Sequence, residues 1–97
     1  MKTLEDSKIT LGKAYDLIRN AVNDDTVAVT MSICWDGACY DGEVLTASFD
    51  IVTLKLSDYD TGVEIPAKDI TEIYLMDNNI IHIFANGKYS VMVYIVD

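Results

Sequence analysis

Hydrophobic and polar residues alternate along most of the chain after residue 26, with the period of two that is typical of half-buried β-strands. The clearest case is the run from Leu45 to Phe49, which continues after Asp50 as a second run from Val52 to Leu56. No Gly or Pro interrupts the chain at Asp50, so the pattern predicts a bend or bulge there rather than a full loop. A ribbon that curls in this way favours a small barrel.

Turn residues divide the alternating segments into strands. Asp36–Gly37 and Asn86–Gly87 are strong signals for hairpin turns, and residues 58–62, Asp-Tyr-Asp-Thr-Gly, have the composition of a turn. Pro66 cannot donate to a strand ladder and predicts a tight turn after a short strand. The predicted strands are residues 26–35, 39–49, 51–57, 62–66, 70–76, 79–85 and 88–96.

Residues 10–23 follow a different, helical period. Thr10 is suited to the N-cap position and the polar residues from Asn23 onward end the run. The apolar stripe of this predicted helix consists of Leu11, Ala14, Tyr15, Ile18, Ala21 and Val22. The stripe indicates a helix packed on the barrel, with a partner-binding helix as the alternative. The predicted fold class is α+β, mostly β, with residues 1–97 forming a single domain.

The last two predicted strands are apolar on both faces, which indicates burial on both faces. In the strand 88–96, the face formed by Met92, Tyr94 and Val96 is nearly as apolar as the face that includes Val91 and Val93. A chain of 97 residues with one short helix has little else to cover a second face. We therefore expect a homodimer whose interface residues are Ile80, Phe84, Met92, Tyr94 and Val96. The alternative is that the helix 10–23 covers this face in a monomer.

The segment from Ile65 to Ile73 has the pattern Ile-Pro-x-x-x-Ile-x-x-Ile and follows a bent strand pair. This order resembles the small five-stranded barrels of the SH3-like and Sm-like type over about residues 26–75, and a helix before the first strand suits the Sm-like version. Sm-like proteins read RNA with an Asn in the bent strand pair and an Arg-Gly pair near the closing strand. Here Thr53 and Pro66-Ala67-Lys68 stand near those positions, so the resemblance implies the architecture and no RNA site.

Charge is strongly negative and unevenly distributed. The chain has seven Lys and Arg against sixteen Asp and Glu, for a formal charge of −9, and only three of the cations lie beyond residue 20. Such a surface repels phosphate and favours a basic partner, although an acidic surface also serves solubility. The residues predicted to form an acidic partner-binding face are Asp36, Asp41, Glu43, Asp58, Asp60, Glu64, Asp69 and Glu72.

Residues able to carry catalysis or hold a metal are sparse. His82 is the single histidine and lies inside a predicted strand, with no nucleophile or carboxylate pair marked as its partner. Cys34 and Cys39 flank a short loop, where a disulfide is geometrically conceivable, but reduced thiols are expected in a cytoplasmic protein. We expect no enzymatic activity, no metal site and no cofactor.

These observations favour a non-enzymatic acidic protein that binds and blocks a basic surface of a partner protein. Partners that themselves bind nucleic acid carry such surfaces, and small acidic inhibitors of the phage anti-defence type work in this way, by nucleic-acid mimicry. The alternative is a self-assembling barrel that binds a small molecule or peptide between subunits, with Trp35, Tyr40, Tyr59, Tyr74 and Tyr94 as contacts. No apolar run approaches the roughly 18 residues of a membrane span, and the expected location is the cytoplasm.

Overall fold

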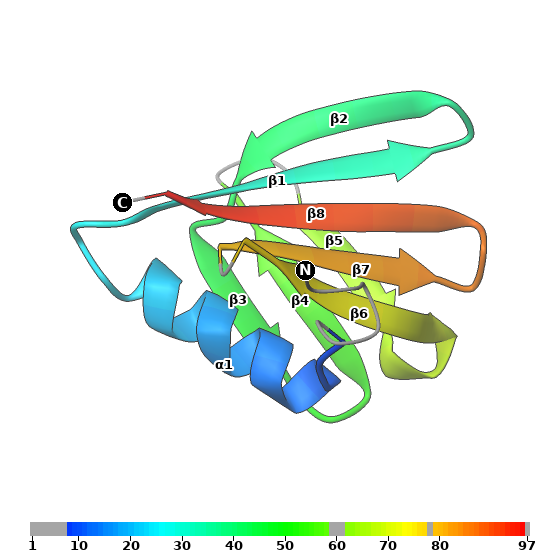
Figure 1. Ribbon diagram of the computed structural model, residues 1–97, viewed down its shortest axis with the longest axis horizontal. Helices are drawn as coiled ribbons and strands as arrows, with labels where there is room; N and C mark the ends of the chain where they lie inside the picture. Colours follow the sequence, from blue (N-terminus) through cyan, green and yellow to red (C-terminus); the bar gives the residue numbers. More distant parts are fainter. Residues whose placement is uncertain (1–7, 59–61, 78, 97) are drawn as a thin grey trace.

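The computed structural model describes residues 8–58, 62–77 and 79–96. It contains one α-helix followed by antiparallel strands, which confirms the predicted α+β, mostly β class (Figure 1). The elements are α1 (Leu11–Val22), β1 (Ala28–Trp35), β2 (Ala38–Glu43), β3 (Thr46–Phe49), β4 (Thr53–Ser57), β5 (Gly62–Pro66), the 3₁₀ turn η2 (Ala67–Asp69), β6 (Ile70–Met76), β7 (Ile80–Ala85) and β8 (Tyr89–Val96).

The helix begins and ends as its sequence indicates. The Thr10 side chain accepts a hydrogen bond from the Lys13 backbone N–H at 3.2 Å, and Asn23 forms the C-cap. Such an N-cap satisfies one of the backbone donors that the first helical turn leaves unpaired. Ala14, Ile18 and Ala21 form the buried stripe. The predicted helix is confirmed to within one residue at each end.

The strands form two sheets rather than one continuous ribbon. The five-stranded sheet has the order β2-β1-β8-β7-β6, and the three-stranded sheet has the order β3-β4-β5. Figure 1 shows α1 lying alongside β3. Between the sheets lies a core of buried aliphatic residues, in which Leu54, Leu56 and Ile65 of the small sheet are fully buried. This arrangement does not identify an SH3-like or Sm-like barrel, so that resemblance stays a prediction.

The prediction of one strand over residues 39–49 is wrong, because the chain changes sheets in its middle. Val44 donates its backbone N–H to Val29 of β1 at 2.9 Å, whereas Leu45 donates to Ser57 of β4 at 2.8 Å. Consecutive residues therefore bond to different sheets. The alternation of apolar and polar residues changes phase at this point, because Val44 and Leu45 are adjacent apolar residues.

The connection at Asp50 is a tight turn rather than the predicted bend. Phe49 pairs with Leu54, so β3 and β4 form an antiparallel hairpin. The Asp50 carboxylate closes the turn by accepting hydrogen bonds from the backbone N–H groups of Val52 (3.1 Å) and Thr53 (2.8 Å). Ile51, between Asp50 and Val52, has a φ of 78°. Local side-chain bonding of this kind lets Asp reverse the chain without Gly or Pro.

The β1–β2 hairpin contains a disulfide between Cys34 and Cys39, and the expectation of free thiols is wrong for this structure. Asp36 and Gly37 both have positive φ, as the predicted two-residue turn requires. This turn makes Cys34 and Cys39 direct cross-strand partners with Cα atoms 4.1 Å apart. The two sulfur atoms are therefore within bonding reach on one face of the hairpin.

Candidate functional site

Strand register defines two faces of the five-stranded sheet, because residues directly opposite each other in a ladder point to the same side. Asp41 lies opposite Ser32, Ser32 opposite Met92, Met92 opposite His82, and His82 opposite Tyr74, which gives one row across all five strands. We call the face that carries this row the outer face. Its residues on the five strands are Cys39, Asp41, Glu43, Ala28, Thr30, Ser32, Cys34, Ser90, Met92, Tyr94, Val96, Ile80, His82, Phe84, Glu72, Tyr74 and Met76.

The apolar residues of the outer face do not belong to the core. The core consists of inward-facing residues of both sheets, such as Val91 and Val93, together with Ala14, Ile18 and Ala21 of α1. The alternative in which the helix covers the outer face is therefore wrong. Because the helix has a single apolar stripe, the stripe that packs between the sheets is not free to cover the opposite side.

Aromatic and sulfur-containing side chains fill the centre of the outer face. The rings of His82 and Phe84 have centroids 4.1 Å apart, and Tyr74 meets Phe84 edge to face at 5.8 Å. The Tyr94 hydroxyl donates to the Met92 sulfur at 3.4 Å. These contacts hold flat, polarisable groups side by side on three neighbouring strands. Tyr, Phe and Met are the residue types that concentrate at protein interfaces.

His82 is the residue of this centre whose type can change charge near neutral pH. Its Nε2 atom is buried and has no hydrogen-bond partner among the residues that the structure describes. Burial lowers the pKa of His82 below its usual value, because a charged imidazolium loses hydration there. The ring is therefore neutral at pH 7 and adds no positive charge to the outer face.

Carboxylates stand at both edges of the outer face. Asp41 and Glu43 are exposed on the edge strand β2. Glu72 lies on β6 at the opposite edge, where it accepts a hydrogen bond from the Tyr74 hydroxyl at 2.9 Å. The five strands of the sheet contain no Lys or Arg. The outer face thus combines an apolar, aromatic centre with carboxylates at both edges, and Lys8, which bridges Tyr74, adds a cation at the β6 edge.

The other predicted acidic residues lie elsewhere. Asp36 is in the β1–β2 turn, and Glu64 on β5 forms an ion pair with Lys55 at 3.4 Å. Asp58 follows β4, and its carboxylate approaches Gly42 of β2. Asp69 is half-buried in η2. Asp60 lies outside the described residues. The structure therefore brings Asp41, Glu43 and Glu72 onto one face and distributes the rest.

All five residues of the predicted dimer interface lie on the outer face. Ile80, Phe84, Met92 and Tyr94 are half-buried, and 52% of Val96 is exposed. Their shared face follows from the period of two in each strand of the β7–β8 hairpin. What covers this face stays a prediction.

Sequence reasoning named Trp35, Tyr40 and Tyr74 as possible ligand contacts but did not show how the aromatic residues group. Tyr74 and His82 join Phe84 in one cluster, a contact that depends on the pairing of β6 with β7. Trp35 and Tyr40, at the β1–β2 turn, are 63% and 65% exposed. Their positions beside the Asp36–Gly37 turn were the available signal, because a residue next to a hairpin turn projects beyond the core.

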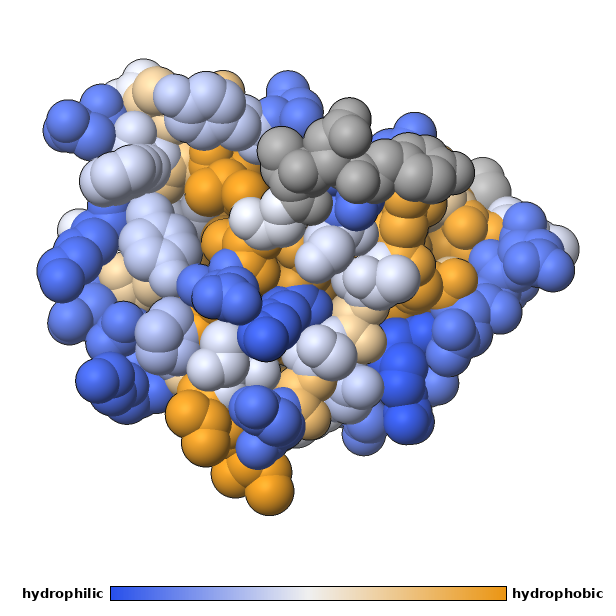
Figure 2. All heavy atoms as spheres, turned by 180° about the vertical axis from the view of Figure 1, so that it is seen from behind, coloured by the Kyte–Doolittle hydropathy of each residue, from blue (hydrophilic) through white to orange (hydrophobic). Residues whose placement is uncertain are grey.

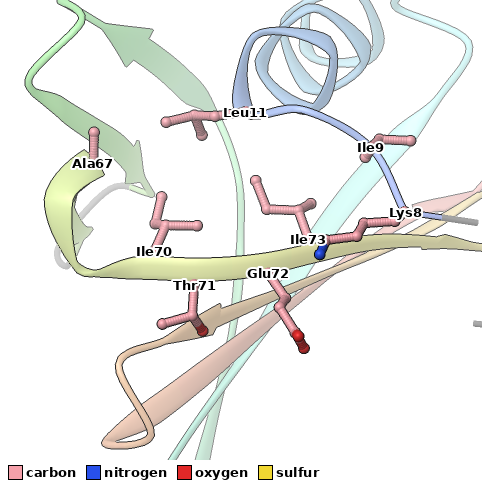
Figure 3. A pocket seen from close by; sticks show the side chains of 8 residues that line it. All are labelled: Lys8, Ile9, Leu11, Ala67, Ile70, Thr71, Glu72 and Ile73. Carbon is pink, nitrogen blue, oxygen red and sulfur yellow. The ribbon is translucent and has the colours of Figure 1, made fainter. Parts of the chain in front are cut away.

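Two surface cavities lie beside β6 and beside Trp35. One cavity of ≈ 200 Å³ lies where the segment before α1 crosses β6 (Figure 3). Figure 3 shows Ile70 and Ile73 on one side of β6 and Thr71 and Glu72 on the other. A second cavity, of ≈ 340 Å³, is lined by Trp35 and Tyr89 together with Ile33, Val63, Glu64 and Lys88. Within the described ranges, no group of three or more His, Cys, Asp or Glu residues is placed to hold a metal ion.

The described part of the chain contains no helix that is long and apolar enough to cross a membrane. Comparison with known proteins gives no matching family model, no matching curated protein and no matching solved structure.

Proposed function

We propose that this protein is a non-enzymatic interaction protein whose outer face binds a basic surface of a partner protein. The observation that carries the proposal is the composition of that face. Its aromatic and Met residues lie outside the core, its two edges bear Asp41, Glu43 and Glu72, and its strands contain no cation. A partner with Arg and Lys side chains complements both features.

Cationic side chains of a partner interact favourably with both the aromatic centre and the carboxylates at the edges of the outer face. An Arg or Lys over the face of Tyr or Phe contributes about 0.5–1 kcal/mol at an exposed site and about 2 kcal/mol when desolvated. Carboxylates at the edges steer a basic partner toward the surface and raise its association rate. Tyr94 and Phe84 supply the rings, while Asp41 and Glu43 supply the charge.

A second copy of the chain fits this face less well. The apolar hairpin that predicted a homodimer does lie on the outer face. Yet two outer faces brought together would place Asp41, Glu43 and Glu72 of each copy at one interface, with no Lys or Arg from any of the five strands and with Lys8, beside Tyr74, as the cation at the β6 edge. Like charges placed against each other at an interface oppose association. We therefore favour the basic partner, and treat dimerisation through this face as the competing outcome.

The inhibitor form of the proposal rests on charge alone. If the contacted surface is one that holds nucleic acid, an acidic protein bound there blocks it, as phage anti-defence inhibitors do. Mimicry of a nucleic acid would also need carboxylates that follow a phosphate path. The acids of the outer face lie at its two edges instead, which supports the broader proposal of a basic protein partner. The cavity beside Trp35 and Tyr89 supports the alternative of a small-molecule site.

Charge reversal on the outer face tests this function. The probe is hexa-arginine, titrated into isotope-labelled protein and followed by NMR chemical shifts. We expect shifts concentrated on the outer face, and affinity reduced by about tenfold or more in the double variant Asp41→Lys, Glu43→Lys, since each lost contact between close charges is worth about 1 kcal/mol or more. The matched control is Asp16→Lys, Asp25→Lys, which makes the same charge change at exposed positions outside the sheet.

Two results would contradict the proposal. One is an equal loss of affinity in both double variants, which would mean that only net charge matters. The other is a dimer by light scattering at micromolar concentration that Met92→Lys dissolves, which would assign the outer face to self-association.

A further inference from the structure

The edge strand β2 presents unused backbone hydrogen-bonding groups. In an antiparallel ladder, residue pairs alternate between those that exchange hydrogen bonds and those that do not. The bond from Val44 N–H to Val29 O makes the 29–44 pair a bonded one, so the pairs 31–42, 33–40 and 35–38 are bonded as well. The short Cα separation of 4.1 Å between Cys34 and Cys39 fits a non-bonded pair. Cys39, Asp41 and Glu43 therefore direct their N–H and C=O groups away from β1.

The opposite edge of the same sheet is partly occupied. Along β6, Lys8 forms a bridge with Tyr74, and Ile9 donates its N–H to Ile73 O at 3.0 Å. Within the described residues, no backbone hydrogen bond reaches the outward groups of β2, and every residue of β2 is exposed apart from the half-buried Gly42. An open edge of this kind is a template for strand addition.

The two sides of β2 differ in chemistry. On the outer face, Asp41 and Glu43 place two carboxylates two residues apart. On the inward side, the exposed rings of Trp35 and Tyr40 border a cavity of ≈ 230 Å³ next to the turn. Trp35 and Tyr40 are diagonal neighbours in the β1–β2 ladder, so both rings project from the same side.

We propose that β2 takes an extended basic segment of the partner as an added antiparallel strand. Cys39, Asp41 and Glu43 exchange backbone hydrogen bonds with it. In a bonded antiparallel pair, side chains directly opposite share a face, so the partner residues opposite Asp41 and Glu43 carry Lys or Arg. The residues between them face Trp35 and Tyr40 and are apolar or aromatic. This inference rests on the proposed function and names the way in which the partner binds.

A defined peptide tests the proposal. The probe is acetyl-Lys-Tyr-Lys-Tyr-Lys-Tyr-amide, mixed with the protein while amide hydrogen exchange is followed by NMR. We expect exchange at Cys39, Asp41 and Glu43 to slow by about tenfold or more, because their N–H groups become bonded. Tyr40 and Gly42 act as internal controls, since their N–H groups already bond to β1. Absence of binding, or binding without this alternating protection, would overturn the proposal.

N-methylated peptides give a control of identical sequence. Methylation of the backbone nitrogens of the Lys residues blocks the peptide edge that meets Asp41 and Glu43. Methylation of the backbone nitrogens of the Tyr residues leaves that edge intact. We expect the first peptide to lose binding by about tenfold or more and the second to keep it, since it retains every bond to β2. Equal binding by both methylated peptides would overturn strand addition.

Two protein variants separate this proposal from the proposed function. Asp41→Pro removes both the charge and an outward N–H, and Pro is tolerated where that N–H faces solvent at an edge. Asp41→Asn removes the charge alone. Weaker binding by Asp41→Pro than by Asp41→Asn supports strand addition. Equal weakening overturns strand addition while leaving the acidic surface in place, and no weakening in either variant contradicts both.

Discussion

His82 is the residue whose chemistry is most changed by its place on the outer face. Burial lowers its pKa in the folded protein, so near and below pH 6.5 the unfolded chain binds more protons than the folded chain. The free energy of unfolding should therefore rise as the pH increases toward the usual histidine pKa of about 6.5 and level off above it. His82→Gln should flatten this part of a urea-denaturation series. If the free energy of unfolding rose with pH just as steeply in His82→Gln, His82 would not be the source of this pH dependence.

Ile51 is the residue with the most strained backbone for its type. It is a β-branched residue at φ 78° and 82% exposed, so its side chain contributes little packing. Figure 2 shows a hydrophobic protrusion at the lower edge of the molecule, where Figure 1 places the β3–β4 turn. Glycine adopts positive φ without the cost of a Cβ atom, and a sparsely populated conformation costs about 1–3 kcal/mol.

Replacement of Ile51 by Gly should therefore stabilise the protein by about 1 kcal/mol, measured as the free energy of unfolding in urea. The matched control is Val52→Gly in the same turn, at a residue whose φ is not positive. That change should destabilise the fold, because Gly only adds freedom to the unfolded chain. A destabilising effect of Ile51→Gly would show that the apolar tip contributes contacts worth more than the strain.

The β1–β2 hairpin is the element on which both proposals depend. Its disulfide closes a loop with a sequence separation of five residues, which in the chain-entropy account is worth about 2 kcal/mol. Cys34→Ser, Cys39→Ser should lower the free energy of unfolding by up to about that amount. It should also speed amide exchange in β2 more than in β7, since β7 pairs on both sides. If amide exchange sped up equally in β2 and β7, the disulfide would stabilise the whole fold rather than the β1–β2 hairpin in particular.

Element boundaries could be predicted where the signal is local. The cap at Thr10 and the turns at Asp36–Gly37 and Asn86–Gly87 are set by neighbouring residues, and the predicted helix and most strands follow from them. At Val44–Leu45 the adjacent apolar residues break the period of two, which is a local sign of a break, but the change of sheet itself depends on which distant strand each residue bonds to and could not be predicted. The same reason hid the extent of the outer face beyond the β7–β8 hairpin, since the pairing of β1 with β8 joins segments far apart in the chain.

The whole molecule is held together by one core between the two sheets and the helix. Leu56 is fully buried in that core. Leu56→Ala should lower the free energy of unfolding by about 2–5 kcal/mol, through lost burial and the cavity left behind. Met92→Ala, on the outer face, should cost clearly less because Met92 lies outside the core. Comparable losses in the two variants would mean that the outer face is part of the folding core.

At the scale of the whole molecule, the central claim is that the outer face binds a basic partner through its charge. The charge dependence of binding tests this claim most directly. The measurement is the affinity of hexa-arginine for the wild-type protein, for Asp41→Lys, Glu43→Lys and for Asp16→Lys, Asp25→Lys, across a salt series from about 0.05 to 0.5 M, over which the Debye length falls severalfold. We expect affinity to fall with salt, and Asp41→Lys, Glu43→Lys to bind far more weakly than the control at every concentration. Identical affinities for the two double variants, or binding unaffected by salt, would contradict an acidic-edged outer face as the partner-binding surface.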